Sequence, residues 1–382
     1  MKLNKKLDTL AESATIRLNS EAKALQDQGI KIFNLTVGEL DFETPKPIQA
    51  AVRKCLSQNK YTPTLGLLEL RTSIAKDVSR IYRWPVTKAN IAVTAGAKQA
   101  LYNIFQIICN PGDEVLIPTP SWVSYEHQVT LAGGKSVFVP LSDTFDLDVP
   151  ALKRALTRKT KAIIINSPHN PTGAVFTQKS LRALAKMLKR KDIIIVADDI
   201  YQSLLYTKAY APVTTVLRER DRLIIVNGFS KSYALTGWRI GYMVAHPDII
   251  EANNRLQSHS SGNASILSQR GALASFQHVV TPAFVKVLAR RKKTAEEILR
   301  AIPNIKFIAP KGAFYFFVDI RKVERDTVRW CEKLLQEEGV AVVPGEAFRC
   351  PGYVRISFAC GEKDLVTALR RIRRFTLRYS NI

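Results

Sequence analysis

Short apolar runs alternate with longer amphipathic stretches through the middle of the chain. Strands are predicted at Ile91–Thr94, Glu114–Ile117, Ser136–Pro140, Ala162–Asn166, Ile193–Ala197 and Leu223–Val226. Helices are predicted between them, at Ala97–Cys109, Trp122–Leu131, Pro150–Leu156 and Gln178–Lys189, the first with apolar residues at helical spacing. The strand runs are continuously apolar, which is typical of strands buried on both faces of a parallel sheet. The pattern therefore predicts an α/β fold, with helices covering a sheet.

The two ends of the chain follow a different pattern. Residues 1–30 are predicted to be helical, and Ile32–Val37 is predicted to be a short strand. Near the other end, a long charged helix at 281–302 precedes a mixture of strands (Ala313–Val318, Val354–Phe358) and helices (Arg325–Glu338, Lys363–Arg378). We expect a large domain over residues 36–275. Residues 1–35 and 276–382 are expected to form a smaller α+β domain, joined to it by the long helix.

Composition and charge narrow the class of protein. The chain has 382 residues and is 46% hydrophobic, which excludes a mainly disordered chain. No run of 18 apolar residues occurs, so no membrane span is expected. The net charge of +24 has two interpretations, attraction of anions such as nucleic acid or a generally basic, solvated surface. Because the basic residues are spread along the chain, we favour the second and expect neither a nucleic-acid nor a membrane partner.

The cysteines and the N-terminus indicate the compartment. The five cysteines are odd in number and include no CxxC pair, which disfavours a disulfide framework and a zinc site. The five histidines show no metal-ligand spacing either, so no metal is expected. The first residues, MKLNKKLDTL, lack the apolar core of a signal peptide. We therefore expect a cytoplasmic protein.

The segment Gly228–Gly241, GFSKSYALTGWRIG, carries the strongest chemical signal. Walker A, GxGxxG, HExxH and GxSxG motifs do not occur in the chain. In the segment, Lys231 follows a predicted strand and Arg239 comes eight residues later. A lysine in a buried cleft can form a Schiff base, and an arginine can grip a phosphate with two hydrogen bonds.

This segment resembles the pyridoxal-phosphate attachment site of class I/II aminotransferases at every position of the pattern. Further landmarks follow in the family's order, so the resemblance extends from about Ser13 to the C-terminal helix. It is strongest to the bacterial Iβ aspartate aminotransferases. The resemblance implies pyridoxal 5'-phosphate as cofactor and the fold type I of PLP-dependent transferases. In that fold a mostly parallel, mixed sheet covered by helices forms the large domain, beside a smaller α+β domain.

The resemblance assigns a role to each matching residue, beginning with the cofactor ring. Lys231 matches the lysine that forms the Schiff base, and Asp198 matches the carboxylate that pairs with the pyridine nitrogen. Tyr201 and Asn170 match the hydrogen-bond partners of the ring oxygen. An ionised carboxylate keeps that nitrogen protonated, which strengthens the ring as an electron sink. Lys231, Asp198 and Tyr201 are thus the predicted catalytic residues, with Lys231 as the general base and acid at Cα.

The cofactor phosphate is assigned a second group of residues. Ser230 and Arg239 match side-chain ligands of the phosphate. Gly96, Ala97 and Lys98 lie at a predicted strand-to-helix turn, where backbone N–H groups can bind it.

The remaining matches concern stacking, the substrate and a second subunit. Trp122 matches the aromatic residue that stacks on the ring, and Tyr61 matches a tyrosine that reaches the phosphate of the partner subunit's site. Arg355 matches the arginine that binds the substrate α-carboxylate, and Gly38 matches a glycine near that carboxylate. Trp122 and Asn170 are also expected to contact the substrate. A homodimer with shared active sites follows from the match of Tyr61.

The residue at position 98, Lys98, indicates which class of substrate the enzyme uses. Many family members have Ser or Thr there, and in the Iβ group the lysine resembles the group that receives the distal carboxylate of a dicarboxylic substrate. Ser13–Thr15 also matches a segment near the substrate in that group. The resemblance therefore implies a ping-pong aldimine/ketimine exchange between an L-amino acid, foremost aspartate, and 2-oxoglutarate. The alternatives are an aminotransferase for aromatic or other amino acids and a PLP-dependent β-elimination lyase.

Overall fold

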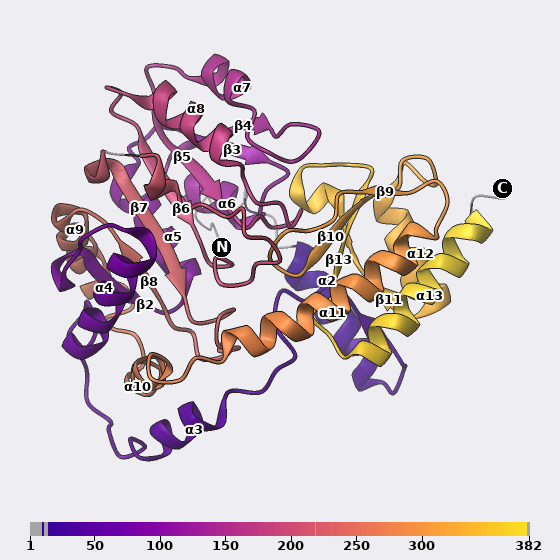
Figure 1. The fold of residues 1–382 in the computed structure, drawn as a ribbon, viewed down its shortest axis with the longest axis horizontal. Helices are drawn as coiled ribbons and strands as arrows, with labels where there is room; N and C mark the ends of the chain where they lie inside the picture. Colours follow the sequence, from indigo (N-terminus) through magenta and orange to yellow (C-terminus); the bar gives the residue numbers. More distant parts are fainter. Residues whose placement is uncertain (1–9, 11–13, 218, 380–382) are drawn as a thin grey trace, which may run out of the picture.

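Two β-sheets, each with its own helices, lie beside each other in the computed structural model (Figure 1). The structure describes residues 10, 14–217 and 219–379. The long helix α11 (Thr281–Arg300) runs from the part around the larger sheet to the part around the smaller one. Within the described ranges, no helix is long and apolar enough to cross a membrane.

The larger sheet has seven strands in the order β2-β8-β7-β6-β5-β3-β4. They are β2 (Ile91–Thr94), β3 (Glu114–Thr119), β4 (Lys135–Pro140), β5 (Thr160–Asn166), β6 (Ile194–Asp198), β7 (Leu223–Gly228) and β8 (Gly241–Val244). Strand β8 is antiparallel to β2 and β7, whereas the other pairs are parallel. The predicted strands of the middle region all lie in this sheet, and β8 is an addition to them.

Both faces of this sheet are buried, which explains the continuous apolar runs. In β5, Ile163 and Ile165 belong to one hydrophobic cluster, whereas Ala162 and Ile164 belong to another on the opposite face. The first cluster is covered by α4 (Leu68–Tyr82), α7 (Val149–Ala155), α8 (Gln178–Leu188) and α10 (Ile266–Ser275), with α3 (Lys46–Arg53) beside α10. The second is covered by α5 (Ala97–Ile108), α6 (Ser124–Leu131) and α9 (Pro247–Ser258).

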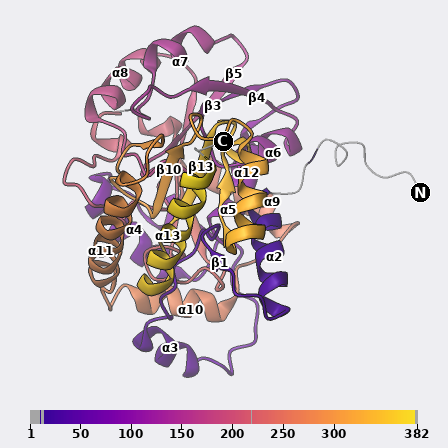
Figure 2. The same ribbon diagram turned by 90° about the vertical axis from the view of Figure 1, so that its right-hand side faces the viewer.

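The smaller sheet is antiparallel and has its own core. Its order is β12 (Val343–Pro344), β13 (Tyr353–Ser357), β10 (Tyr315–Asp319) and β9 (Lys306–Phe307). Helices α11, α12 (Thr327–Glu338) and α13 (Glu362–Tyr379) pack against it, and Figure 2 shows α13 across this side of the molecule. Helix α2 (Ala14–Asp27) and the parallel pair β1 (Phe33–Asn34) and β11 (Val340–Ala341) lie at its margin. Short 3₁₀ turns occur at Lys88–Asn90, Val213–Thr215, Arg220–Arg222 and Gly345–Phe348.

The prediction of one strand over Ile32–Val37 is wrong, because β1 ends at Asn34. Leu35 still donates its N–H to Ala341, but its carbonyl accepts from Ser357 of the smaller sheet. The carbonyl of Thr36 then accepts from the Arg355 side chain. The backbone of this segment therefore divides its hydrogen bonds among different partners instead of continuing one ladder. As a result, the chain enters the region between the two sheets.

Candidate active site

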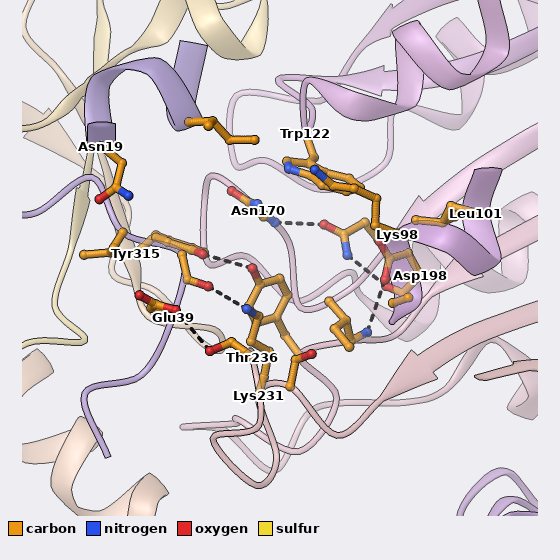
Figure 3. Close-up of a pocket in the computed structure, with 18 of the residues that line it drawn as sticks. Asn19, Glu39, Lys98, Leu101, Trp122, Asn170, Asp198, Lys231, Thr236 and Tyr315 are labelled. Carbon is orange, nitrogen blue, oxygen red and sulfur yellow. Dashed lines mark hydrogen bonds between the residues drawn. The ribbon is translucent and has the colours of Figure 1, made fainter. Parts of the chain in front are cut away.

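The carboxyl ends of the parallel strands meet at one edge of the larger sheet. The segments that follow β2, β3, β5, β6 and β7 each carry at least one predicted site residue, among them Lys98, Trp122, Asn170, Tyr201 and Lys231. This edge is where open α/β sheets bind their ligands, because the loops there converge and the helix N-termini face the ligand. A pocket of about 500 Å³ lies at this edge (Figure 3). Its size suits a small organic ligand.

Most of the predicted residues line this pocket. They are Gly38, Ala97, Lys98, Trp122, Asn170, Asp198, Tyr201, Ser230, Lys231, Arg239 and Arg355. Gly96 does not line it but lies directly behind Arg239. Tyr61 is elsewhere and is 97% exposed. Ser13 lies outside the described residues, as do the side chains of Ala14 and Thr15.

Asp198 is a buried carboxylate with a small number of defined partners. It ends β6 and is only 4% exposed. Its Oδ2 accepts a 2.6 Å hydrogen bond from the Tyr125 hydroxyl, and its Oδ1 accepts from the N–H of Ile200 at 3.3 Å. Burial raises the pKa of Asp198 to about 6, although both hydrogen bonds and the charge of Lys231 act in the opposite direction. Asp198 can therefore be ionised at neutral pH, and a cation placed beside it would lower its pKa further.

Lys231 extends into the same pocket from the loop after β7. Its Nζ donates a 2.5 Å hydrogen bond to the carbonyl of Gly38. Burial lowers the pKa of Lys231 to about 8, Glu39 opposes this, and the positive charges of Arg239 and Arg355 lower it further. With that pKa, about a tenth of its amine is unprotonated at pH 7, and more at higher pH. An amine in that state can act as a nucleophile or accept a proton.

A chain of hydrogen bonds links Arg355 to Asp198. Arg355 is 2% exposed and donates through Nη1 to the Asn170 side-chain oxygen at 3.0 Å and through Nη2 to the Thr36 carbonyl at 2.6 Å. The N–H of Asn170 donates to the Asn166 side chain at 2.9 Å, which in turn donates to the backbone carbonyl of Asp198 at 2.8 Å. Burial lowers the pKa of Arg355, and its Nε has no hydrogen-bond partner among the residues that the structure describes. The guanidinium is therefore buried with unused capacity to bind an anion.

The first turn of α5 forms a cradle in which a side chain would not fit. Gly96 has φ +86°, and a Cβ there would lie 2.8 Å from Arg239 Nη2. A Cβ on Gly241 would lie 2.5 Å from the backbone nitrogen of Ala97. The N-terminal N–H groups of a helix lack intrahelical partners and attract anions. With Arg239 and the buried hydroxyl of Ser230 beside them, these groups can hold a phosphate.

The pocket also contains residues that the sequence did not single out. Tyr125 bonds to Asp198, Tyr315 bonds to Tyr201, and the Glu39 carboxylate accepts from Thr236 Oγ1 at 3.0 Å. Figure 3 shows Tyr315 and Glu39 across the pocket from Lys98 and Trp122. The spacing of Tyr125, one helical turn after Trp122, was the only signal for it in the sequence. Tyr315 and Glu39 lie on other parts of the fold, so only the tertiary structure identifies them as pocket residues.

Comparisons with known proteins agree with this geometry. The family model for aminotransferase class I and II matches residues 30–372. The aspartate aminotransferase of Bacillus subtilis is 40% identical, over 100% of both chains. The aspartate/prephenate aminotransferase of Thermus thermophilus is 39% identical, covering 97% of this chain and 98% of its own. The solved structure of the Thermus thermophilus aspartate aminotransferase with maleate has a TM-score of 0.94 at 38% identity, covering 98% of this chain and 100% of that one.

The protein belongs to the class I and II aminotransferases. It has the PLP-dependent transferase fold type I, and the resemblance read from the Gly228–Gly241 segment is confirmed. The family uses pyridoxal 5'-phosphate, and the pocket suits this cofactor. The α5 cradle can take the phosphate, Asp198 can take a protonated ring nitrogen, and Lys231 can take the aldehyde.

Proposed function

We propose that this aminotransferase moves the amino group of L-aspartate to 2-oxoglutarate in two half-reactions at the pocket between the sheets. One observation carries the choice of substrate. Lys98 extends into the pocket with its Nζ 5.1 Å from the centre of the Trp122 ring. Burial, and then the charge of Arg239, lower the pKa of Lys98. Among the described residues, its ammonium group has no hydrogen bond or ion pair.

A second carboxylate on the substrate is the group that this lysine would pair with. A dicarboxylic amino acid can place its α-carboxylate on Arg355 and its distal carboxylate near Lys98, since both line one pocket. A neutral side chain would leave the ammonium of Lys98 partly desolvated and unpaired, which costs binding energy. The relatives named aspartate aminotransferases support the same substrate.

The test is Lys98→Ser, compared with the exposed Lys153→Ser as control. We expect the ratio of kcat/KM for aspartate to that for alanine to fall at least ~10-fold in Lys98→Ser, because the distal carboxylate loses its partner. The control should keep the ratio of the unsubstituted enzyme. An unchanged ratio in Lys98→Ser would exclude aspartate selection by this residue.

A broader substrate range is the second candidate, favoured by one finding. A relative at 39% identity is named an aspartate/prephenate aminotransferase. Aromatic amino acids and prephenate are therefore proposed as additional substrates. The measurement is kcat/KM for phenylalanine, compared with that for aspartate. A β-elimination lyase is the less favoured alternative, because these relatives are named aminotransferases.

The roles proposed for the side chains follow from their positions. Bound pyridoxal 5'-phosphate supplies an electron sink for the electrons of the substrate Cα–H bond. Asp198 would hold a proton on the ring nitrogen, and Tyr201 and Asn170 would donate hydrogen bonds to the ring oxygen. Lys231 removes and returns the proton at Cα, for which a pKa near 8 is well matched. Arg355 would bind the α-carboxylate and orient the Cα–H bond, while Trp122 would stack on the ring.

The phosphate ligands and the second subunit complete the proposal. Ser230, Arg239 and the N–H groups of Ala97 and Lys98 would hold the phosphate. The N–H of Gly96, predicted as a third backbone donor, instead donates to the Thr94 carbonyl at 2.8 Å. Gly38 would lie beside the substrate carboxylate. We also propose a cytoplasmic homodimer, in which Tyr61 reaches the partner's site. Its support is that Tyr61 lies outside its own chain's pocket and is almost fully exposed, which is unusual for a tyrosine.

A further inference from the structure

Tyr315 is a buried tyrosine of the smaller sheet that reaches the pocket of the larger one. It begins β10, is fully buried and lines the pocket. Its hydroxyl lies 2.9 Å from the hydroxyl of Tyr201, and the two rings meet edge to face with centroids 5.9 Å apart. Figure 3 shows its side chain entering the pocket from the side opposite Lys98.

The same side chain contacts two other predicted site residues. The guanidinium carbon of Arg355 lies 4.4 Å from the centre of the Tyr315 ring, a distance at which a cation is attracted by the aromatic face. A Cβ on Gly38 would lie only 3.2 Å from the Tyr315 hydroxyl, so Gly38 packs closely on it. Tyr315 thus touches residues from three separate segments that the proposed function places on the cofactor or on the substrate.

Hydrogen-bond counting gives a direction to the contact between the tyrosines. A phenol has one proton to donate. If Tyr201 donates its proton to the cofactor ring oxygen, its own oxygen can only accept, and Tyr315 must be the donor. A hydroxyl that accepts a hydrogen bond becomes a stronger donor in turn, since linked hydrogen bonds polarise one another.

We propose that Tyr315 is a positioning residue with two separable parts: its hydroxyl donates to Tyr201 and strengthens the bond of Tyr201 to the ring oxygen, and its ring holds the guanidinium of Arg355 for the substrate carboxylate. This inference rests on the proposed function for the roles of Tyr201 and Arg355. The position of Tyr315 on β10 makes it a link between the two sheets at the site.

Tyr315→Phe tests the hydroxyl, because it keeps the ring over Arg355. The pKa obtained by titrating the visible band of the bound cofactor should rise by on the order of half a unit, since a weaker donor stabilises the ring oxygen less. The Kd for maleate, a dicarboxylate without an amino group, should stay within about twofold of the unsubstituted value. Tyr206→Phe is the matched control. The partly buried hydroxyl of Tyr206 donates a 2.6 Å hydrogen bond to the Ala313 carbonyl, and Tyr206 does not line the pocket.

Tyr315→Leu tests the ring, because it removes the aromatic face as well. The Kd for maleate should rise ~10-fold, and the spectroscopic pKa should rise as in Tyr315→Phe. An unchanged pKa in Tyr315→Phe, or a pKa change of the same size in the control, overturns the inference while cofactor binding and transamination still stand. An unsubstituted protein that binds no pyridoxal 5'-phosphate overturns the proposed function and this inference with it.

Discussion

The environment of Asp198 shows how single contacts set the chemistry of the site. Burial raises its pKa to about 6, and the hydrogen bond from the Tyr125 hydroxyl opposes this rise most strongly. The proposed role of Asp198 requires its ionised form. Activity should therefore be lost as the pH falls through the pKa of Asp198, and Tyr125 extends the active range toward acid.

Tyr125→Phe should move the acidic limb of the pH profile to higher pH. Without the 2.6 Å hydrogen bond, the ionised form of Asp198 loses its best donor and its pKa rises. A hydrogen bond to a charged group corresponds to a shift of about one pH unit. The measurement is kcat/KM for aspartate between pH 5 and pH 9, with the half-exposed Tyr102→Phe as control. Identical acidic limbs in Tyr125→Phe and the unsubstituted enzyme would refute the role of Tyr125.

At the scale of elements, the contact between β8 and α5 is closer than any side chain permits. Gly241 opens β8, and Gly96 precedes the first turn of α5. The atoms that a Cβ on Gly241 would meet are backbone atoms of Gly96 and Ala97, at 2.7 and 2.5 Å. A backbone cannot move aside as the end of a flexible side chain can. The glycine therefore keeps the helix N-terminus in place for the phosphate.

Gly241→Ala should weaken both the fold and the cofactor site. We expect the unfolding free energy to fall by about 1–3 kcal/mol from overpacking. We expect the Kd for pyridoxal 5'-phosphate to rise at least ~10-fold, because the N–H groups of the first turn are displaced. Denaturant titration and cofactor titration measure the two effects. Gly361→Ala is the control, since a Cβ there meets only Asp364 Oδ2 at 4.0 Å, and similar losses in both variants would contradict the argument.

At the scale of the whole molecule, the site exists because two sheets meet. The larger sheet supplies Lys231 and Asp198, and β13 and β10 of the smaller sheet supply Arg355 and Tyr315. We propose the division into a large domain over 36–275 and a small domain of 1–35 and 276–382. This division is supported by the hydrophobic cluster around the smaller sheet, which is built mainly from residues 1–35 and 276–382. The buried Leu40 and Leu204 join this cluster from the other side of the boundary.

The proposed homodimer predicts complementation between two inactive variants. Tyr61→Ala removes the residue given to the partner, and Lys231→Ala removes the amine of the chain's own site. In a mixed dimer, the site of the Tyr61→Ala subunit receives Tyr61 from the Lys231→Ala subunit and is intact. Random assembly makes about half of the dimers mixed, so co-refolding should give about a quarter of the unsubstituted activity. No activity above that of the separate variants would exclude a shared site.

The spacing of apolar residues along the chain predicted most of the helices and strands, and the elements that it missed have physical reasons. The buried parallel strands were predictable because both faces demand apolar residues. Strand β8 was missed because its first residue, Gly241, is also the last residue of the lysine motif, so no turn separates the two. Helices α3, α4, α9 and α10 were not predicted either. The mean hydropathy of α10 hardly differs between its faces, and small or polar residues such as Ser268 and Gln269 are buried there.

The sequence by itself determined the α/β layer, the family and the residues of the lysine motif. These depend on local spacing, and a motif keeps its spacing wherever the chain runs. Only the tertiary structure showed that Tyr125 donates a hydrogen bond to Asp198 and that Tyr315 contacts both Tyr201 and Arg355. It also showed that Lys98 lines the pocket without an ion-pair partner among the described residues. The first of these contacts joins Tyr125 to Asp198, 73 positions apart, and Tyr201 and Tyr315 are 114 positions apart. Their distances are set by how the sheets pack, which no local pattern records.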